Sequence, residues 1–329
     1  FSTAFLLYGI ALVYGATGAT NFVGIKTSIT TYSLDHSGLL LVGIGLLLVG
    51  FGFKVAAAPF HMWAPDVYEG APTPITAYMA AAVKAASFAA FFRLWLEAFP
   101  TLLTTWHQAV WWLAAITMVV GNLVALSQRN IKRLLAYSSI AHAGYILVAL
   151  EVGTTLGSSA FMFYLFAYTI ATLGAFGVVV ALGRSGEDNM GVEEYAGLWS
   201  VRPGLATVMA VFMLALLGFP IFGGIGFFAK WYVLQAALQG PYPQTHLALV
   251  LVITSVISAG YYLYVVMVMF MKPRSSTAAL PDRAGGWTTA VVWASAAIIL
   301  IFGLFPDALV SLTQRSTPAV SKEVALRSR

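Results

Sequence analysis

The chain has 329 residues, of which 60% are hydrophobic and 9% are charged, and its mean hydropathy is +0.86. A soluble domain carries about 25% charged residues, so this composition excludes an ordinary soluble enzyme and indicates an all-α polytopic membrane protein. The absence of cysteine excludes disulfides and protein-ligated iron–sulfur clusters within the chain, and the net charge of +5 comes from scattered residues that form no patch for nucleic acid.

Apolar runs of spanning length follow one another along the chain and predict a single transmembrane domain over residues 1–329. We expect nine membrane spans, at residues 1–16, 39–58, 73–96, 109–128, 131–150, 158–183, 203–239, 246–271 and 287–312. The connections are short and polar, which favours an antiparallel helical bundle, and the connection 59–74, with four prolines, reads as a loop. The first run has 16 residues and no initial Met, while about 20 are needed to cross the hydrocarbon. We therefore expect this span to be truncated and further helices to precede Phe1.

The run 203–239 is too long for one straight span. As a helix it would extend roughly 55 Å, against a hydrocarbon core of about 30 Å. It contains Pro220 between several glycines, which predicts a break near Gly218–Gly224 with Lys230 on the second half. Lys54 stands five residues before Pro59 in a similar setting. Broken helices at corresponding places in two halves of a chain are typical of inverted repeats.

Lys84 is the strongest candidate for a functional residue. It lies near the middle of its run, about 18 Å of helix rise from either end. The lysine stem reaches only about 6 Å, so the ammonium cannot extend to an interface. A lysine at such depth costs roughly 3 kcal/mol and is a functional hypothesis by default. The alternative is a buried structural ion pair.

Four other residues are weaker candidates. Lys54 lies near the end of its run, where its ammonium could reach the interface, and Lys230 is supported by the break before it. His142, in the apolar segment SSIAHAGY, fits a proton relay and a hydrogen-bonded core residue equally well. His61 follows Pro59 and is better explained as a loop residue that holds turns.

The twelve Asp and Glu residues all fall in predicted loops or at predicted helix ends. The lysines therefore have no carboxylate partner in the middle of a span, and a partner must come from upstream sequence, from a neighbouring chain or from water. Two charges about 15 Å apart at an effective dielectric of 20 interact by roughly 1 kcal/mol. Protonation of one lysine can then bias the next, so a row of lysines joined by water predicts a proton wire.

Three long segments resemble a known family: FKVAAAPFHMWAPDVYEGAPTPITAYMAAAVKAASFAAFFRL, GNLVALSQRNIKRLLAYSSIAHAGYILVAL and LLGFPIFGGIGFFAKWYVL. They are similar to the antiporter-like membrane subunits of respiratory complex I, the proton-translocating NADH:quinone oxidoreductase, and most closely to the N-type subunit. The resemblance covers essentially the whole chain. It implies a fourteen-helix bundle with two inverted five-helix repeats, helices 4–8 and 9–13, in which this chain begins within helix 6.

The resemblance also assigns roles to the candidate residues. Lys54 matches the lysine of broken helix 7, Lys84 that of helix 8 and Lys230 that of broken helix 12, while His142 falls on helix 10. The family's glutamate partner for the helix 7 lysine would lie upstream of Phe1. The repeat is imperfect, because Gly260 stands where a counterpart of Lys84 is expected.

The function implied is proton translocation as a membrane-arm subunit of NADH:quinone oxidoreductase. The chain would hold no cofactor, and FMN, iron–sulfur clusters and quinone would be bound by other subunits. Its partners would be neighbouring antiporter-like and small membrane subunits and lipids, with no nucleic acid. We expect it in the inner (plasma) membrane of a bacterium rather than in mitochondria or thylakoids. The alternatives are a subunit of a multisubunit cation/proton antiporter or membrane-bound hydrogenase, and a purely structural membrane-arm subunit.

Overall fold

The computed structural model describes residues 2–183, 190–220, 224–239, 243–274 and 285–317, and these are helical with no β-strand among them. The expectation of an all-α polytopic membrane protein is therefore confirmed. Six helices in the described residues are long and apolar enough to cross a membrane, namely Thr73–Ala98, Pro100–Ala125, Ile131–Glu151, Thr155–Leu182, Thr245–Met271 and Gly286–Leu304. The remaining apolar runs form shorter or bent helices.

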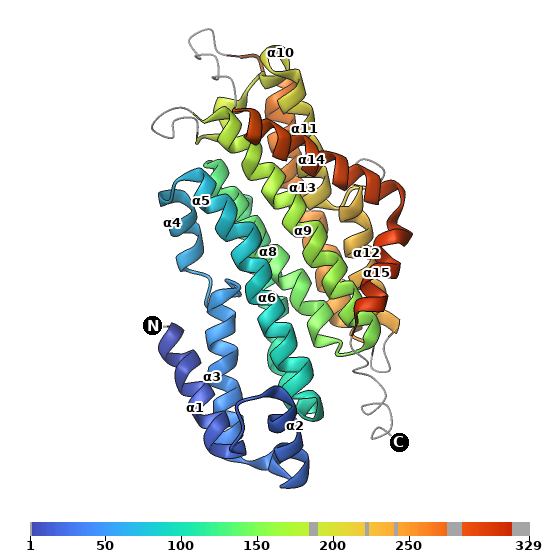
Figure 1. The fold of residues 1–329 in the computed structure, drawn as a ribbon. Coiled ribbons are helices and arrows are strands. Elements are labelled where there is room, and N and C mark those ends of the chain that lie inside the picture. The colour runs from blue at the N-terminus through green and yellow to red at the C-terminus, as the bar shows by residue number, and fades with distance from the viewer. Residues whose placement is uncertain (1, 184–189, 221–223, 240–242, 275–284, 318–329) are drawn as a thin grey trace.

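The first three helices form the lower left part of the molecule in Figure 1. Helix α1 (Ser2–Thr17) packs along α3 (Gly38–Lys54). In the sequence they are separated by α2 (Phe22–Thr31), which is bent by 48° from α1, and by a short 3₁₀ turn, η1 (Leu34–His36). Helix α2 is outside the predicted apolar runs, because its threonines and lysine lower its hydropathy. It starts where the Asn21 side chain accepts a hydrogen bond from the Gly24 N–H.

The proline-rich connection is wrongly described as a loop. Residues Trp63–Gly70 form helix α4, in which Pro65 occupies the first turn, where its missing N–H breaks no intrahelical bond. The next span is continuous but alternates between α- and π-helical turns. It consists of α5 (Thr73–Tyr78), the π-turn η2 (Met79–Val83), α6 (Lys84–Arg93) and the π-turn η3 (Leu94–Ala98).

Helix α8 (Ile131–Glu151) lies at the centre of the bundle, and 94% of its spanning window is buried. It follows a short 3₁₀ turn, η4 (Pro100–Leu102), and helix α7 (Leu103–Ala125), and it precedes α9 (Thr155–Leu182). Helices α7 and α8 are in extensive contact. A side chain on α8 is therefore enclosed by protein on every face, which makes this helix the place where buried polar groups can meet.

A broken helix lies beside α9. Helix α11 (Pro203–Leu217) ends where Gly218 adopts a φ of 75°, and α12 starts at Ile225 and ends at Gln239. The predicted break at Gly218–Gly224 falls between these two helices, although residues 221–223 lie outside the described residues. Unwound backbone within a bundle is tolerated where it is covered by protein or lines water.

The chain closes with helices on the right of Figure 1. Two short elements, η5 (Val192–Tyr195) and α10 (Leu198–Val201), precede α11, and α13 (Thr245–Met271) and α14 (Gly286–Leu304) follow α12. The last predicted span, 287–312, extends too far. Pro306 cannot continue α14 and starts a separate helix, α15 (Pro306–Ser316).

An exposed ion pair joins η5 to the end of α13. Both carboxylate oxygens of Glu193 lie 2.7 Å from the Lys272 Nζ, and the Tyr264 hydroxyl donates to the same carboxylate. These hydrogen bonds from Lys272 and Tyr264 lower the pKa of Glu193 below its ordinary value. The pair is solvent-exposed, so its contribution to stability is small.

We predict that Lys272→Gln slightly lowers the thermal unfolding midpoint at neutral pH. A carboxylate with a lowered pKa contributes stability above its ordinary pKa and loses it as the pH falls. The difference between variant and wild type should therefore be complete above the ordinary pKa of a glutamate carboxyl, about 4.3, and shrink as the pH falls below it. Thermal unfolding of the detergent-solubilised protein at several pH values measures it, and a difference that grows on acidification would contradict the assignment.

Candidate functional site

Lys84 is buried in the centre of the bundle, as its depth in the sequence predicts. It is 2% exposed, and it is the first residue after the π-turn η2. Its Nζ donates to two acceptors on α8, the Ser139 carbonyl oxygen at 2.9 Å and the Ser139 Oγ at 2.7 Å. Both acceptors are neutral, so the ammonium is solvated by dipoles and not by a counter-charge.

Helix α8 presents three polar residues at a spacing of three, Ser139, His142 and Tyr145. Successive members are separated by about 4.5 Å of helix rise and turn by about 60° around the axis. Ser139 receives Lys84, and the ring of Tyr145 faces Lys230, with the lysine Nζ 4.8 Å from the ring centroid. His142 therefore stands between the residues that contact the two lysines.

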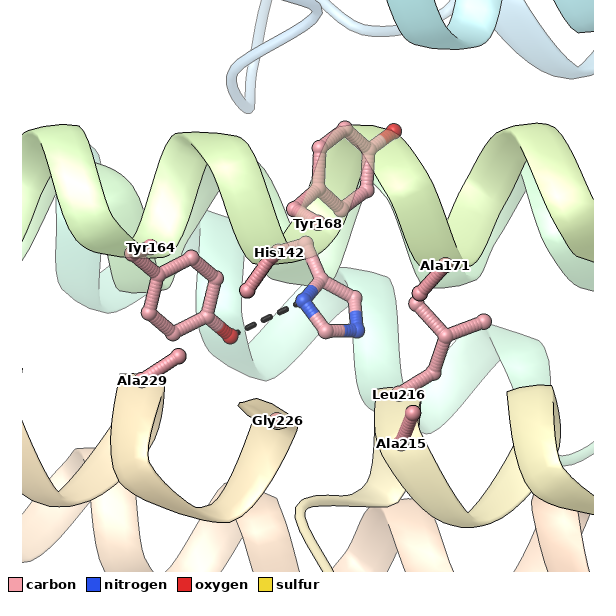
Figure 2. A pocket seen from close by; sticks show the side chains of 9 residues that line it. His142, Tyr164, Tyr168, Ala171, Ala215, Leu216, Gly226 and Ala229 are labelled. Carbon is pink, nitrogen blue, oxygen red and sulfur yellow. Dashed lines mark hydrogen bonds between the residues drawn. The ribbon is translucent and has the colours of Figure 1, made fainter. Parts of the chain in front are cut away.

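His142 is held by two tyrosine hydroxyls from different helices. Its Nδ1 lies 2.8 Å from the Tyr164 hydroxyl, the contact drawn as a dashed line in Figure 2. Its Nε2 lies 3.1 Å from the Tyr262 hydroxyl, which in turn lies 2.5 Å from the Ser138 Oγ. A neutral imidazole donates from one nitrogen and accepts at the other. The four groups thus form a chain in which every hydrogen bond can reverse its direction.

A small cavity opens beside His142 at the break between α11 and α12. Its volume is about 10 Å³, enough for a single water molecule. Figure 2 shows the imidazole of His142 between α9 and the broken helix, with Gly226 on the opposite wall. The lining residues are His142, Tyr164, Ala167, Tyr168, Ala171, Ala215, Leu216, Gly226 and Ala229.

Lys230 is 8% exposed and belongs to α12. Its Nζ donates to the Leu217 carbonyl oxygen at 2.8 Å, the last carbonyl of α11. Because carbonyls at a helix C-terminus lack intrahelical partners and carry the negative end of the helix dipole, they are suited to receive an ammonium. The break in the helix supplies the acceptor that Lys230 needs.

Lys54 is not brought into this group. It is the last residue of α3, and its side chain is exposed on the described structure. His61 also lies apart from these residues; it is 8% exposed, and its ring meets that of Tyr137 edge-on, with the ring centroids 6.5 Å apart. The described residues therefore bring together Lys84, His142 and Lys230, called the row below, and leave Lys54 outside it.

One carboxylate at a helix end is buried. Glu151 is the last residue of α8, as the expectation of a loop or helix end allows, but it is only 2% exposed. Its Oε1 lies 3.3 Å from the His107 Nδ1, and its Oε2 makes no hydrogen bond to a described residue. It lies nine residues beyond His142, or about 13.5 Å along the helix, so it does not pair with either lysine.

The sequence reasoning missed the hydroxyl groups of the site. Their residues are Ser138, Ser139, Tyr145, Tyr164, Tyr168 and Tyr262. Tyrosines in an apolar helix are ordinarily assigned to packing or to the membrane interface. One sequence signal of these hydroxyls was available. The pair Ser138–Ser139 stands one helical turn before His142 in an apolar run, which indicates polar partners for the histidine.

A model of one protein family matches most of the chain. The family is described as "NADH:quinone oxidoreductase/Mrp antiporter, TM", and the match covers residues 1–258. The chain belongs to this family. It is 52% identical over 320 residues to NADH-quinone oxidoreductase subunit N of Gemmatimonas aurantiaca, covering 97% of this chain and 61% of that protein. It is 47% identical to the subunit of the same name from Trichlorobacter lovleyi, covering 97% and 65%.

Solved structures extend the comparison. A chain of respiratory complex I from Thermus thermophilus with bound aureothin is 40% identical and superposes with a TM-score of 0.79, over 94% of this chain and 65% of that one. A chain of the Mrp complex from Dietzia sp. has a TM-score of 0.86 at 21% identity, over 98% and 66%, and shows a shared fold alone. The chain thus spans less than two thirds of the length of these relatives.

Proposed function

We propose that the protein containing this chain is a proton-translocating subunit in the membrane arm of an NADH:quinone oxidoreductase. Protons would move along Lys84, His142 and Lys230, driven by electron transfer in other subunits. The observation that carries the proposal is the arrangement of two buried lysines, Lys84 and Lys230, whose hydrogen-bond acceptors are neutral oxygens. They lie on either side of the hydrogen-bonded chain through His142, in which each hydrogen bond can reverse its direction. Homology to subunits named as part of this enzyme, at 52% and 47% identity, supports the same function.

Two gaps in the row would be bridged by water. Lys84 contacts Ser139, while the chain to His142 starts at Ser138. On the other side Tyr164 ends the chain, and Lys230 is reached only through the ring of Tyr145. The cavity beside His142 has room for one water and is lined by Tyr164 and by Ala229, the residue before Lys230, so it lies on the side of the second gap. A water that bridges two polar groups makes hydrogen bonds nearly as favourable as a direct one.

We assign Lys54 the entry to the first half of the path. Its exposed position at the end of α3 is suited to a partner supplied by a neighbouring subunit. The chain would act as one transmembrane domain with neighbouring membrane-arm subunits and lipids as its partners. FMN, iron–sulfur clusters and quinone would be held by other subunits, and the assembly would lie in a bacterial plasma membrane.

A multisubunit cation/proton antiporter is the second candidate, because the Mrp chain has the same fold. The two functions differ in what drives the proton. In inverted membrane vesicles that contain the assembled protein, our proposal predicts acidification of the lumen when NADH is added. Acidity that responds to a sodium pulse and not to NADH would favour the antiporter. Co-purification of the subunit with NADH-oxidising hydrophilic subunits gives an independent test.

Tyr262→Phe tests the hydrogen-bonded chain within this function. The variant keeps the ring and removes the hydroxyl that joins Ser138 to His142. We expect NADH-driven proton translocation to fall about fivefold, the effect of one net hydrogen bond, in vesicles with a normal amount of complex. The fall is limited because water can occupy the space of the hydroxyl. An unchanged rate would remove Tyr262 from the path.

A further inference from the structure

The backbone just before Lys84 is not an ordinary α-helix. Residues Met79–Val83 form a π-turn, and the Lys84 N–H donates to the carbonyl oxygens of Met79 and Ala81. In an α-helix the same N–H would donate to the carbonyl four residues back, that of Ala80. The turn therefore withholds the Lys84 N–H from Ala80. Such single π-turns inside α-helices occur frequently at functional sites.

The Ala80 carbonyl has a different donor. The Tyr168 hydroxyl, from α9, donates to it at 3.0 Å. Tyr168 is 2% exposed, so its hydroxyl has no bulk water to bond instead. A buried hydroxyl or carbonyl without a hydrogen-bond partner destabilises the fold. The bond across the helix interface thus stabilises the π-turn against the α-helical alternative.

The ring of Tyr168 connects this bond to the centre of the site. Its centroid lies 5.3 Å from that of the His142 ring. Figure 2 shows the ring beside His142, with the hydroxyl directed away from the cavity. One side chain therefore touches both the histidine and the backbone that orients Lys84, and it does so without entering the hydrogen-bonded chain through His142.

We propose that Tyr168 is a positioning residue for proton translocation, which holds the π-turn before Lys84 and so keeps the Lys84 ammonium on Ser139. This rests on the proposed function of the row. A π-turn contains one residue more than the α-helical turn it replaces. Its conversion would rotate Lys84 by about 100° relative to the helix that precedes the turn. The lysine Nζ would then leave both acceptors on Ser139.

Tyr168→Phe is the direct test, in the assembled complex. It removes one oxygen and leaves the ring against His142. We expect NADH-driven proton translocation to fall on the order of tenfold, since the hydroxyl that holds the Ala80 carbonyl in the π-turn is lost and the Lys84 ammonium turns away from Ser139. The structure of the variant complex, determined by electron microscopy, should show an α-helical turn at residues 79–83 and the Lys84 Nζ out of contact with Ser139. Retention of the π-turn and of the Lys84–Ser139 bonds would overturn the proposal.

Tyr195→Phe is the matched control. Tyr195 is also buried, at 3% exposure, but its hydroxyl makes no hydrogen bond to a described residue and it lies outside the row. The control should translocate protons at the wild-type rate. Equal rates for Tyr168→Phe and Tyr195→Phe would overturn the positioning role. If Lys84→Met is inactive in parallel, the proposed function stands; if Lys84→Met is fully active, the proposed function itself fails.

Deletion of Ala82 provides a rescue that a merely structural tyrosine would not show. Ala82 is exposed within the π-turn, and its removal leaves an α-helical turn with the flanking helices in register. The Lys84 N–H would then donate to Met79 and the Ala85 N–H to the Ala80 carbonyl, four residues back in the shortened chain, while the ammonium stays on Ser139. In this background Tyr168→Phe should cause no further fall in translocation, whereas the same tenfold fall would contradict the mechanism. The structure of the single variant decides the matter if the deletion does not assemble.

Discussion

Lys84→Met is expected to lower NADH-driven proton translocation by about a hundredfold, the scale on which a positioned proton-transfer group acts, while the complex still assembles. Methionine fills the space of the lysine stem without its ammonium. Assembly should be retained because the partners of Lys84 are the neutral carbonyl and hydroxyl of Ser139. Removing the lysine therefore leaves no opposite charge buried without a partner, which is the main cost of breaking a buried ion pair.

The measurement is proton uptake into inverted vesicles after addition of NADH, with the amount of assembled complex determined on native gels. Lys272→Gln serves as the control, because that lysine is exposed and pairs with Glu193 away from the row. Quinone reduction by the same vesicles should fall together with translocation if the two are coupled. A Lys84→Met complex that pumps like the control would assign this chain a structural role in the membrane arm.

Position along the sequence was enough to predict the burial of Lys84 and the break in the helix before Lys230. A charge in the middle of an apolar run, or a run too long for a bilayer, violates a simple rule of membrane proteins. Lys84 and Lys230 are accordingly buried in the structure, and α11 ends at Leu217. The acceptors of these lysines could not be predicted in the same way, because Ser139 and the Leu217 carbonyl are brought to them by tertiary packing.

The same limit applies to the tyrosines and to the short helices. Tyr168 and Tyr262 lie 88 and 120 residues from the groups they contact, Ala80 and His142. No periodicity in the sequence records a contact of that separation. Helix α4 was missed for the opposite reason: prolines are a local signal of a loop, but the one proline within α4, Pro65, lies in its first turn, where it is tolerated. Glu151 lies at a helix end, as expected, but its burial could not be predicted because only tertiary packing encloses it.

Gly226→Ala is expected to reduce the amount of assembled complex by a factor on the order of ten or more, since overpacking against rigid atoms exceeds the usual 1–3 kcal/mol. A Cβ at this position would lie 1.9 Å from the Ala215 carbonyl oxygen and 2.7 Å from its carbon. These atoms belong to the backbone of α11, so no side-chain rotation can make room. Helix α12 would have to move away from α11 as a unit.

That movement would also separate Lys230 from the Leu217 carbonyl, because Lys230 lies one turn after Gly226 on α12. The glycine is therefore required by the close approach of the two halves of the broken helix. Gly286→Ala is the matched control near another helix start, since a Cβ there has no neighbour within 4 Å. Native gels and immunoblots of membranes give the amount of complex for both variants. Wild-type amounts of the Gly226→Ala complex would mean that α11 and α12 are further apart than the structure places them, and that Lys230 takes its acceptor elsewhere.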